Sequence, residues 1–168
     1  MKNMTKLLSD KEVIQKVLDQ ISDKTTDLGD ETWRESVDNY RSEKRFSTEL
    51  DLFQRLPIVF CPSAALAKSG SYVARDVGGV PLLAVRGKDG VVRTFHNSCR
   101  HRGMILAEGS GNASKFICRY HAWAYGLDGN LLNVSGNEGF PDLDKNSHGL
   151  IEVETQEKCG LIFVTQKK

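Results

Sequence analysis

The sequence predicts a mainly β protein, an antiparallel β-sandwich or barrel built from hairpins and preceded by N-terminal α-helices. Short runs rich in β-branched and aromatic residues follow one another from Ile58 onward. Glycine-containing turns separate several of these runs, as tight hairpins require. The earlier part of the chain instead repeats its apolar residues at helical spacing. We therefore expect residues 1–45 to form a helical leader and residues 46–168 to form one β domain.

The leader is expected to begin with an amphipathic helix over residues 10–21. Ser9 and Glu12 have the spacing of a capping box, in which two side chains satisfy backbone N–H groups at a helix start. The apolar positions that follow recur at helical spacing: Val13, Ile14, Val17, Leu18 and Ile21.

Two further helices are expected before the strands begin. A mostly charged stretch over residues 31–44 has one apolar stripe, formed by Trp33, Val37 and Tyr40, which is typical of a surface helix. A short helix over residues 48–56 should follow. It ends there because the next residue is a proline, which disfavours helical geometry in the residue before it.

The β domain is expected to contain strands joined mainly by tight turns. The strands are predicted over residues 58–61, 71–77, 81–86, 91–96, 115–118, 124–127 and 161–165. Glycines at 77–79, 88–90 and 127–130 supply the positive φ angles that hairpin turns need.

Composition and charge exclude several classes of partner. The 168 residues contain 23 Lys and Arg against 22 Asp and Glu, so no charge excess predicts binding to nucleic acid or to an acidic membrane. We find neither a segment apolar enough to span a membrane nor a signal sequence, and expect a cytoplasmic protein. In that compartment, cysteines are more often metal ligands or buried thiols than disulfides.

Two short segments carry the chemistry, and each pairs one cysteine with one histidine. They are Cys99-Arg100-His101-Arg102-Gly103 and Cys118-Arg119-Tyr120-His121. Each lies between predicted strands, so a rigid sheet can hold both loops at one end of the domain. Two thiolates on one iron and two neutral imidazoles on the other define a Rieske 2Fe-2S centre, and the imidazoles raise its potential above that of an all-cysteine cluster.

With these segments, residues 56–164 resemble the Rieske domain of bacterial aromatic-ring-hydroxylating oxygenase large (alpha) subunits. The resemblance includes the lead-in 91–98, the segment 118–125 and the turn 127–131. It implies a Rieske-type β-sandwich with two cluster-binding hairpin loops, in which Cys99 and Cys118 bind one iron and His101 and His121 bind the other.

The resemblance also implies roles for neighbouring residues. Trp123 and Tyr125 would be aromatic packing that covers the second loop, with Tyr120 beside them, and their burial would tune the reduction potential. Gly103 would be the turn residue of the first loop. Arg100, with Arg102, is either a solvated charge or a docking contact for an acidic redox partner.

Some features depart from the family pattern. Arg119 and Ala122 stand where many members have proline and glycine. Family enzymes continue into a domain that holds a mononuclear iron through two histidines and a carboxylate, and His96 and His148 cannot rebuild that site here. This chain alone is therefore not expected to oxygenate a substrate.

The implied function is one-electron transfer. A reductase or ferredoxin would donate electrons, and the mononuclear iron of a catalytic domain or neighbouring subunit would accept them and activate dioxygen for aromatic compound catabolism. Family members form homo-oligomers, often trimers. A low potential within the Rieske range is expected, because Ala122 and Trp123 stand where high-potential Rieske proteins have serine donors.

Three alternatives remain. A free-standing Rieske ferredoxin is disfavoured by the helical leader. A respiratory Rieske protein is disfavoured because Met104 and Tyr120 leave no extra cysteine pair. A zinc-stabilised binding module also uses two cysteines and two histidines, but zinc fingers usually pair cysteine with cysteine. The other two cysteines, Cys61 and Cys159, are expected to be ordinary buried thiols.

Overall fold

The computed structural model describes residues 7–29 and 31–167 and divides the chain into two units, residues 1–41 and 42–168. The first unit contains α1 (Asp10–Asp23) and α2 (Asp38–Arg41). The capping box predicted for α1 is confirmed: the Ser9 hydroxyl accepts from the Glu12 N–H, and the Glu12 carboxylate accepts from the Ser9 N–H at 2.7 Å.

The helix predicted over residues 31–44 is wrong along most of its length. Of the described residues in this range, only those of α2 and the first two residues of α3 (Glu43–Arg55) are helical. Ser42 separates them, because its hydroxyl accepts from the Arg45 N–H and starts a new helix. The apolar stripe that suggested a long helix, Trp33, Val37 and Tyr40, stays exposed. A short helical segment whose apolar side chains stay exposed gains too little free energy from packing to be stable.

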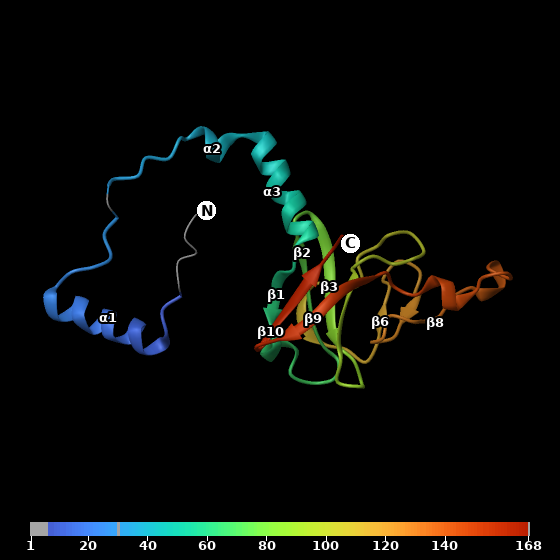
Figure 1. The fold of residues 1–168 in the computed structure, drawn as a ribbon. Coiled ribbons are helices and arrows are strands. Elements are labelled where there is room, and N and C mark those ends of the chain that lie inside the picture. The colour runs from blue at the N-terminus through green and yellow to red at the C-terminus, as the bar shows by residue number, and fades with distance from the viewer. Residues whose placement is uncertain (1–6, 30, 168) are drawn as a thin grey trace. The chain divides into compact units, whose positions relative to one another are not determined.

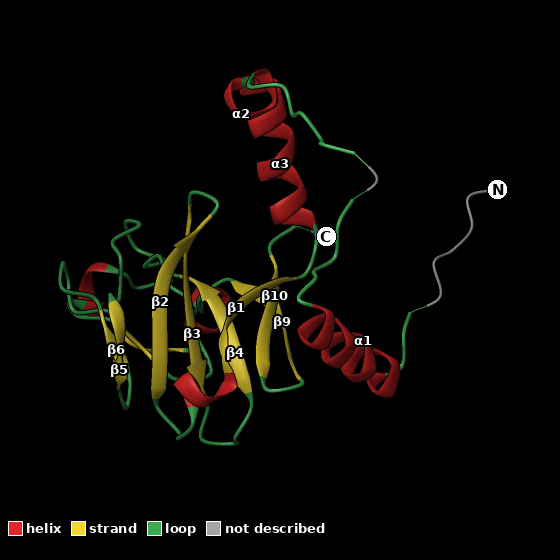
Figure 2. Ribbon diagram, turned by 90° about the vertical axis from the view of Figure 1, so that its left-hand side faces the viewer, coloured by secondary structure: helices red, strands yellow, loops and turns green. Residues whose placement is uncertain are grey.

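The second unit holds two antiparallel sheets (Figures 1 and 2). The larger has the strand order β1-β10-β9-β4-β3-β2-β5, and the smaller has the order β6-β7-β8. The strands are β1 (Ile58–Pro62), β2 (Ser71–Val77), β3 (Val80–Arg86), β4 (Val92–His96), β5 (Gly109–Asn112), β6 (Phe116–Ile117), β7 (Ala124–Tyr125), β8 (Leu131–Asn133), β9 (Glu152–Lys158) and β10 (Leu161–Thr165). The predicted fold class is confirmed.

Three strands were not predicted, for different reasons. The sequence of β5, Gly-Ser-Gly-Asn, contains no strand-favouring residue, and it is extended because it pairs with the free edge of β2. The strand β8 is only three residues long. The start of β9 does alternate between exposed and buried side chains, with Val153 buried between the exposed Glu152 and Glu154. Its many charged residues make this alternation hard to recognise in the sequence.

The predicted glycine turns join β2 to β3, β3 to β4 and β7 to β8. Gly129, in the last of them, has φ +83°, and a Cβ atom there would lie 2.5 Å from Cε1 of Phe95. The site accepts only glycine, since both the backbone conformation and the close approach of Phe95 exclude a side chain. This contact brings the small sheet against the large one.

Two apolar cores form on opposite faces of the large sheet. Along β3, Leu83 and Val85 point into one core, while Leu82 and Ala84 point into the other. That alternation follows from the two-residue period of a strand. The first core also includes side chains of the small sheet and both motif cysteines, so the packing that joins the sheets also fixes the candidate site.

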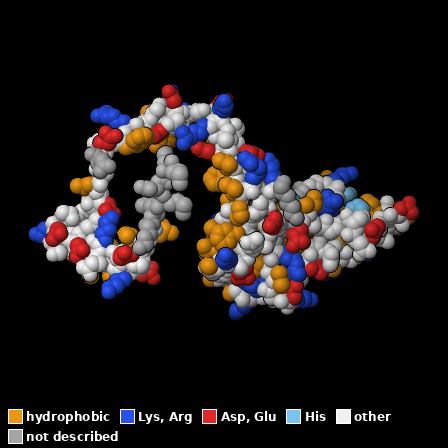
Figure 3. Space-filling view, in the orientation of Figure 1, with side chains coloured by type: hydrophobic (Ala, Val, Ile, Leu, Met, Phe, Trp, Pro, Cys, Tyr) orange, Lys and Arg blue, Asp and Glu red, His pale blue; other side chains and the backbone are white. Residues whose placement is uncertain are grey.

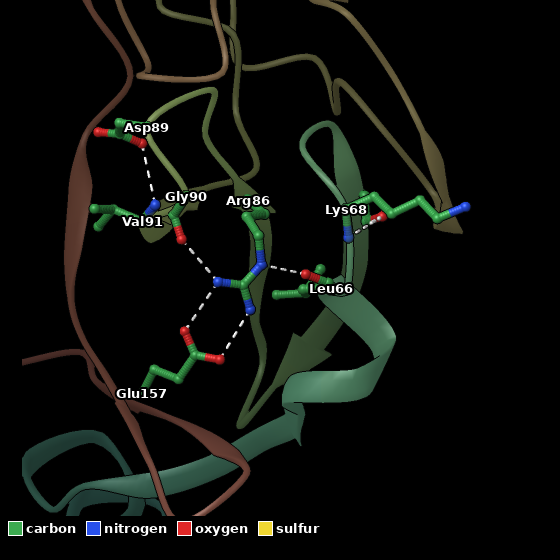
Figure 4. Close-up of polar contacts among 8 residues, drawn as sticks. Leu66, Lys68, Arg86, Asp89, Gly90, Val91 and Glu157 are labelled. Atoms are coloured by element: carbon green, nitrogen blue, oxygen red, sulfur yellow. Dashed lines mark hydrogen bonds and ion pairs between the residues drawn. The ribbon is translucent and has the colours of Figure 1, made fainter.

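A half-buried arginine links strands around the second core (Figure 4). Arg86, on β3, is 16% exposed and donates to both carboxylate oxygens of Glu157 on β9, at 3.0 and 2.8 Å. It also donates to the carbonyl oxygens of Leu66 and Gly90, the latter at 2.8 Å. The hydrogen bonds from Arg86 are the largest cause that holds the pKa of Glu157 below its ordinary value.

The remaining cysteines differ from each other. Cys61 is buried as expected. The prediction for Cys159 is wrong: it is exposed at the tip of the β9–β10 hairpin, with φ +51°, next to Gly160 with φ +75°. Two successive positive φ angles are what a tight hairpin turn requires, and they place the Cys159 side chain outside the core.

Within the ranges 7–29 and 31–167, no helix combines the length and the apolar character needed to cross a bilayer. The cytoplasmic location stays a prediction.

Candidate metal centre

Two loops with the same backbone pattern present the motif residues. In the first loop (residues 97–107), which follows β4, the Cys99 N–H donates to the Met104 carbonyl, and the Gly103 N–H donates to the Cys99 carbonyl, both at 2.8 Å. Gly103 has φ +71°. Both the N–H and the carbonyl of Cys99 therefore form hydrogen bonds with residues of its own loop.

The second loop (residues 118–123), between β6 and β7, repeats this pattern. The Cys118 N–H donates to the Trp123 carbonyl at 2.8 Å, and the Ala122 N–H donates to the Cys118 carbonyl at 2.9 Å. Ala122 matches Gly103 and has φ +56°. The two cysteines thus occupy equivalent places, while His101 and His121 stand two and three residues after them.

Asn97 holds the base of the first loop, and sequence reasoning missed it. Its side-chain oxygen accepts from the N–H groups of Leu106 and Ala107, at 3.0 and 3.2 Å, and its amide donates to the Ala107 carbonyl at 2.7 Å. The side chain is almost fully buried. A polar residue directly before the motif was the available signal, although its sequence position alone could not reveal its burial.

The two histidines meet where the loops meet, and both motif cysteines are buried in the first core. Cys99 and Cys118 are each 3% exposed and unpaired, and the rings of His101 and His121 lie 4.6 Å apart between centroids. Nδ1 of each histidine is buried and has no hydrogen-bond partner among the described residues. An unpaired buried nitrogen costs about 1–3 kcal/mol. Two such nitrogens, on loops that also carry two buried thiols, fit a bound group that takes ligands from both loops.

This arrangement contains no ready single-ion site. In the described part of the chain, no three His, Cys, Asp or Glu side chains are grouped closely enough to hold one metal ion. A bridged pair of irons needs only two protein ligands for each iron, which matches one cysteine pair and one histidine pair.

Aromatic rings surround the two histidines unequally. Trp123 is buried and stacks on His101, with centroids 4.9 Å apart and planes 10° from parallel. Phe140, which the sequence did not single out, lies 5.7 Å from His101. Tyr120 lies 3.8 Å from His121 but is 56% exposed, so the expectation that it would be buried is wrong.

Tyr125 connects the second loop to the first. Its hydroxyl lies 3.3 Å from Sγ of Cys99 and accepts from the Arg100 N–H at 3.0 Å. Burial, and then the hydrogen bond with Cys99, raise the pKa of Tyr125, so the hydroxyl keeps its proton. With its oxygen occupied by Arg100, the hydroxyl can donate that proton to the Cys99 sulfur when the sulfur is a thiolate.

Charged side chains lie at the surface of the two loops. Arg100, Arg102 and Arg119 are exposed, and Figure 3 shows basic and histidine side chains next to one another on this unit. Burial lowers the pKa of His101, and the nearby charges of His121 and Arg102 lower it further. The neutral imidazole, which is the form that binds metal, is therefore favoured.

The other two histidines play no part in this grouping. His96 is on β4, before the first loop. Nδ1 of His148 lies 2.8 Å from the carbonyl oxygen of Asp144, and its ring lies 6.4 Å from that of Trp123.

Comparisons with known proteins decide the family. Residues 57–144 match the family model described as the Rieske [2Fe-2S] domain. The chain belongs to the Rieske family. It is 36% identical over 136 residues to the carnitine monooxygenase oxygenase subunit of Escherichia coli K12, covering 80% of this chain and 36% of that protein. It is 41% identical over 133 residues to the chlorobenzene dioxygenase alpha subunit of Cupriavidus sp. PS12, covering 73% of this chain and 30% of that protein.

Solved Rieske structures agree with the fold. A quaternary ammonium Rieske monooxygenase bound to L-carnitine has a TM-score of 0.73 at 32% identity, covering 78% of this chain and 38% of that one. A naphthalene 1,2-dioxygenase with indole bound has a TM-score of 0.69 at 32% identity, covering 75% and 29%. The chain thus spans about a third of the length of the relatives it matches.

The Rieske match confirms the predicted cofactor, a 2Fe-2S cluster of the Rieske type, and not the zinc alternative. It also supports Rieske-type electron transfer in an oxygenase as the general function.

The strained backbone at Ala122 gives a testable prediction. A left-handed conformation costs a non-glycine residue about 1–2 kcal/mol, and glycine adds about 0.4–1 kcal/mol of chain entropy to the unfolded state. We expect Ala122→Gly to raise the free energy of unfolding by about 0.5–1 kcal/mol, measured by urea denaturation. The matched control Ala113→Gly, where φ is not positive, should lower it; equal effects of the two changes would contradict the prediction.

Proposed function

We propose that Cys99 and Cys118 bind one iron of the cluster and His101 and His121 the other, and that this Rieske unit passes single electrons within an oxygenase. The observation that supports this ligand set most directly is the pair of buried Nδ1 atoms, unpartnered among the described residues, on the two loops that also carry the buried thiols. When bound, the cluster supplies a site that accepts and releases one electron. We also propose residues 46–168 as the Rieske domain and residues 1–45 as its leader.

The protein's own groups would prepare this site in three ways. The cysteines contribute charged thiolates, and the histidines contribute neutral imidazoles through Nδ1. Trp123 and Tyr125 exclude water from the protein side. Nε2 of each histidine then carries the ring proton. That proton is held more tightly when the site has gained an electron, which links the potential to pH.

We propose that the donor is a reductase or ferredoxin and that the acceptor is a mononuclear iron, in a catalytic domain or a neighbouring subunit, that activates dioxygen. The relatives are oxygenase subunits, which supports this placement. The exposed Arg100, Arg102 and Arg119 would favour an acidic partner surface. A homo-oligomer stays a prediction.

The relatives of this chain are named for two classes of substrate. Relatives named for chlorobenzene and biphenyl support the aromatic substrate expected from the sequence, whereas relatives named for carnitine and glycine betaine point to quaternary ammonium compounds. We propose only that the chain serves an oxygenase, since oxygenase subunits of both groups are similar to most of this chain.

Metal and sulfide content test the proposal. The protein, when produced with iron and sulfide, should be red-brown and contain two irons and two acid-labile sulfides per chain. It should give a Rieske-type EPR signal after reduction. A colourless protein that holds one zinc would overturn the proposal.

The hydrogen bond from Tyr125 to Cys99 gives a second prediction. It stabilises negative charge on the sulfur, and so favours the reduced form. Tyr125→Phe should therefore lower the midpoint potential by about 40 mV if about 1 kcal/mol is lost, because 59 mV and 1.36 kcal/mol each correspond to a tenfold change. The control Tyr72→Phe, whose ring packs on Phe116 in the same core, should leave the potential unchanged. A redox titration of both variants decides; equal potentials would refute the prediction.

A further inference from the structure

One aromatic contact with His101 comes from outside both loops. The cover segment (residues 136–148) lies between β8 and β9 and contains η2 (Asn137–Gly139) and η3 (Lys145–His148). Figure 1 shows it extending away from the strands in orange-red. Phe140, within it, is held by its own N–H bonding to the Asn137 carbonyl at 3.0 Å and by its carbonyl accepting from the Leu143 N–H at 3.2 Å.

Phe140 and Trp123 enclose His101 from two directions. Trp123 lies parallel to the imidazole, at 4.9 Å and 10°. The Phe140 ring is perpendicular to both, 5.7 Å and 89° from His101 and 5.6 Å and 80° from Trp123. A parallel ring opposes tilting of the imidazole, and a perpendicular ring beside it opposes rotation and sliding. Together the two rings define one orientation of the imidazole plane.

His121 is held differently. Its aromatic neighbour, Tyr120, comes from the adjacent position in the same loop and is largely exposed. The buried Trp123 supports only His101 by stacking, and the cover segment reaches His101 through Phe140. His101 is therefore the histidine whose orientation depends on a part of the chain remote from its own loop.

We propose that Phe140 is a positioning residue that fixes the plane of the His101 imidazole and keeps water away from that ring. This inference rests on the proposed function, because the ring plane affects the electronic state of the site only if His101 is a ligand. The effect of Phe140 passes through the imidazole.

The experiment uses the whole chain with its cluster and compares Phe140→Leu, Phe140→Tyr and Leu143→Ala. Leu143 belongs to the same cover segment and packs against the same core, so it is the matched control for lost packing. Each variant is measured by thermal unfolding, by redox titration, and by continuous-wave and pulsed EPR of the reduced state. Pulsed EPR reports the nitrogen couplings of the two imidazoles separately.

We expect Phe140→Leu to change the g-values and the coupling of one imidazole, and to raise the midpoint potential. Water admitted beside His101 stabilises the reduced, more negative form. Phe140→Tyr keeps the ring and should retain the wild-type spectrum. Leu143→Ala should lower the thermal unfolding temperature while leaving g-values, couplings and potential unchanged.

Two outcomes would overturn the inference. In the first, Phe140→Leu lowers stability as Leu143→Ala does but keeps wild-type g-values, couplings and potential, so Phe140 only packs the segment. In the second, neither the Phe140→Leu protein nor the Phe140→Tyr protein holds the cluster. Failure of the proposed function is distinguishable, because the unsubstituted chain would then lack the Rieske EPR signal.

Discussion

Replacing His121 with cysteine is expected to lower the midpoint potential of the Rieske centre by on the order of 100 mV, because all-cysteine clusters lie near −400 mV and Rieske centres between about −150 and +300 mV. The physical reason is charge. A thiolate in place of a neutral imidazole adds one negative charge next to the iron and disfavours the added electron. Redox titration followed by EPR measures the shift.

The control for this change is His148→Cys. His148 belongs to the same unit and contacts Trp123, but its Nδ1 lies beside the Asp144 carbonyl and is not an orphaned atom. Its replacement should leave the potential and the EPR spectrum unchanged. A His121→Cys protein with the spectrum and potential of the unsubstituted chain would remove His121 from the ligand set.

Replacing Arg86 with methionine is expected to lower the free energy of unfolding by about 2–3 kcal/mol, within the range for charged hydrogen bonds in a mostly buried site. The substitution removes the donors to Glu157 and to the carbonyl groups of Leu66 and Gly90. It therefore releases β9 and the hairpin after β3 from one another. Urea denaturation near neutral pH measures the loss.

The Arg86–Glu157 pair also predicts a pH dependence. The pKa of Glu157 is lower in the folded protein than its ordinary value of 4.5, so the unfolded chain takes up the proton first. The stability from this pair is complete above pH 4.5 and is lost as the pH falls through the lower, folded pKa. Arg86→Met should therefore lose less stability between neutral and acidic pH than the unsubstituted chain does.

Arg93→Met is the matched control for Arg86. Arg93 pairs with Asp89 four residues away in the same hairpin, and Asp89 is exposed to solvent. Such local, exposed pairs contribute little, so the loss of stability should be clearly smaller. Equal losses for the two arginines would show that Arg86 does not link the strands as described.

The motif residues could be proposed as ligands because the residue types and their spacing indicate the chemistry of the centre. The same holds for the turns: the glycines at Val77-Gly78-Gly79 and around Gly129 reveal positive φ, and the β2 boundaries match their prediction. The helix over 31–44 failed because a stripe of apolar residues indicates a helix only when something packs on it. Within the described part of the first unit, Trp33 is exposed.

By itself the sequence determined the fold class and the two Cys/His segments, because strand alternation, turn glycines and ligand types act over a few neighbouring residues. Only the tertiary structure decided that β5 is a strand, that Asn97 holds the first loop, that Tyr125 reaches Cys99 and that Phe140 reaches His101. Each of these depends on residues at least nine positions apart in the chain. Their energies arise only when the chain folds back on itself, so no local pattern encodes them.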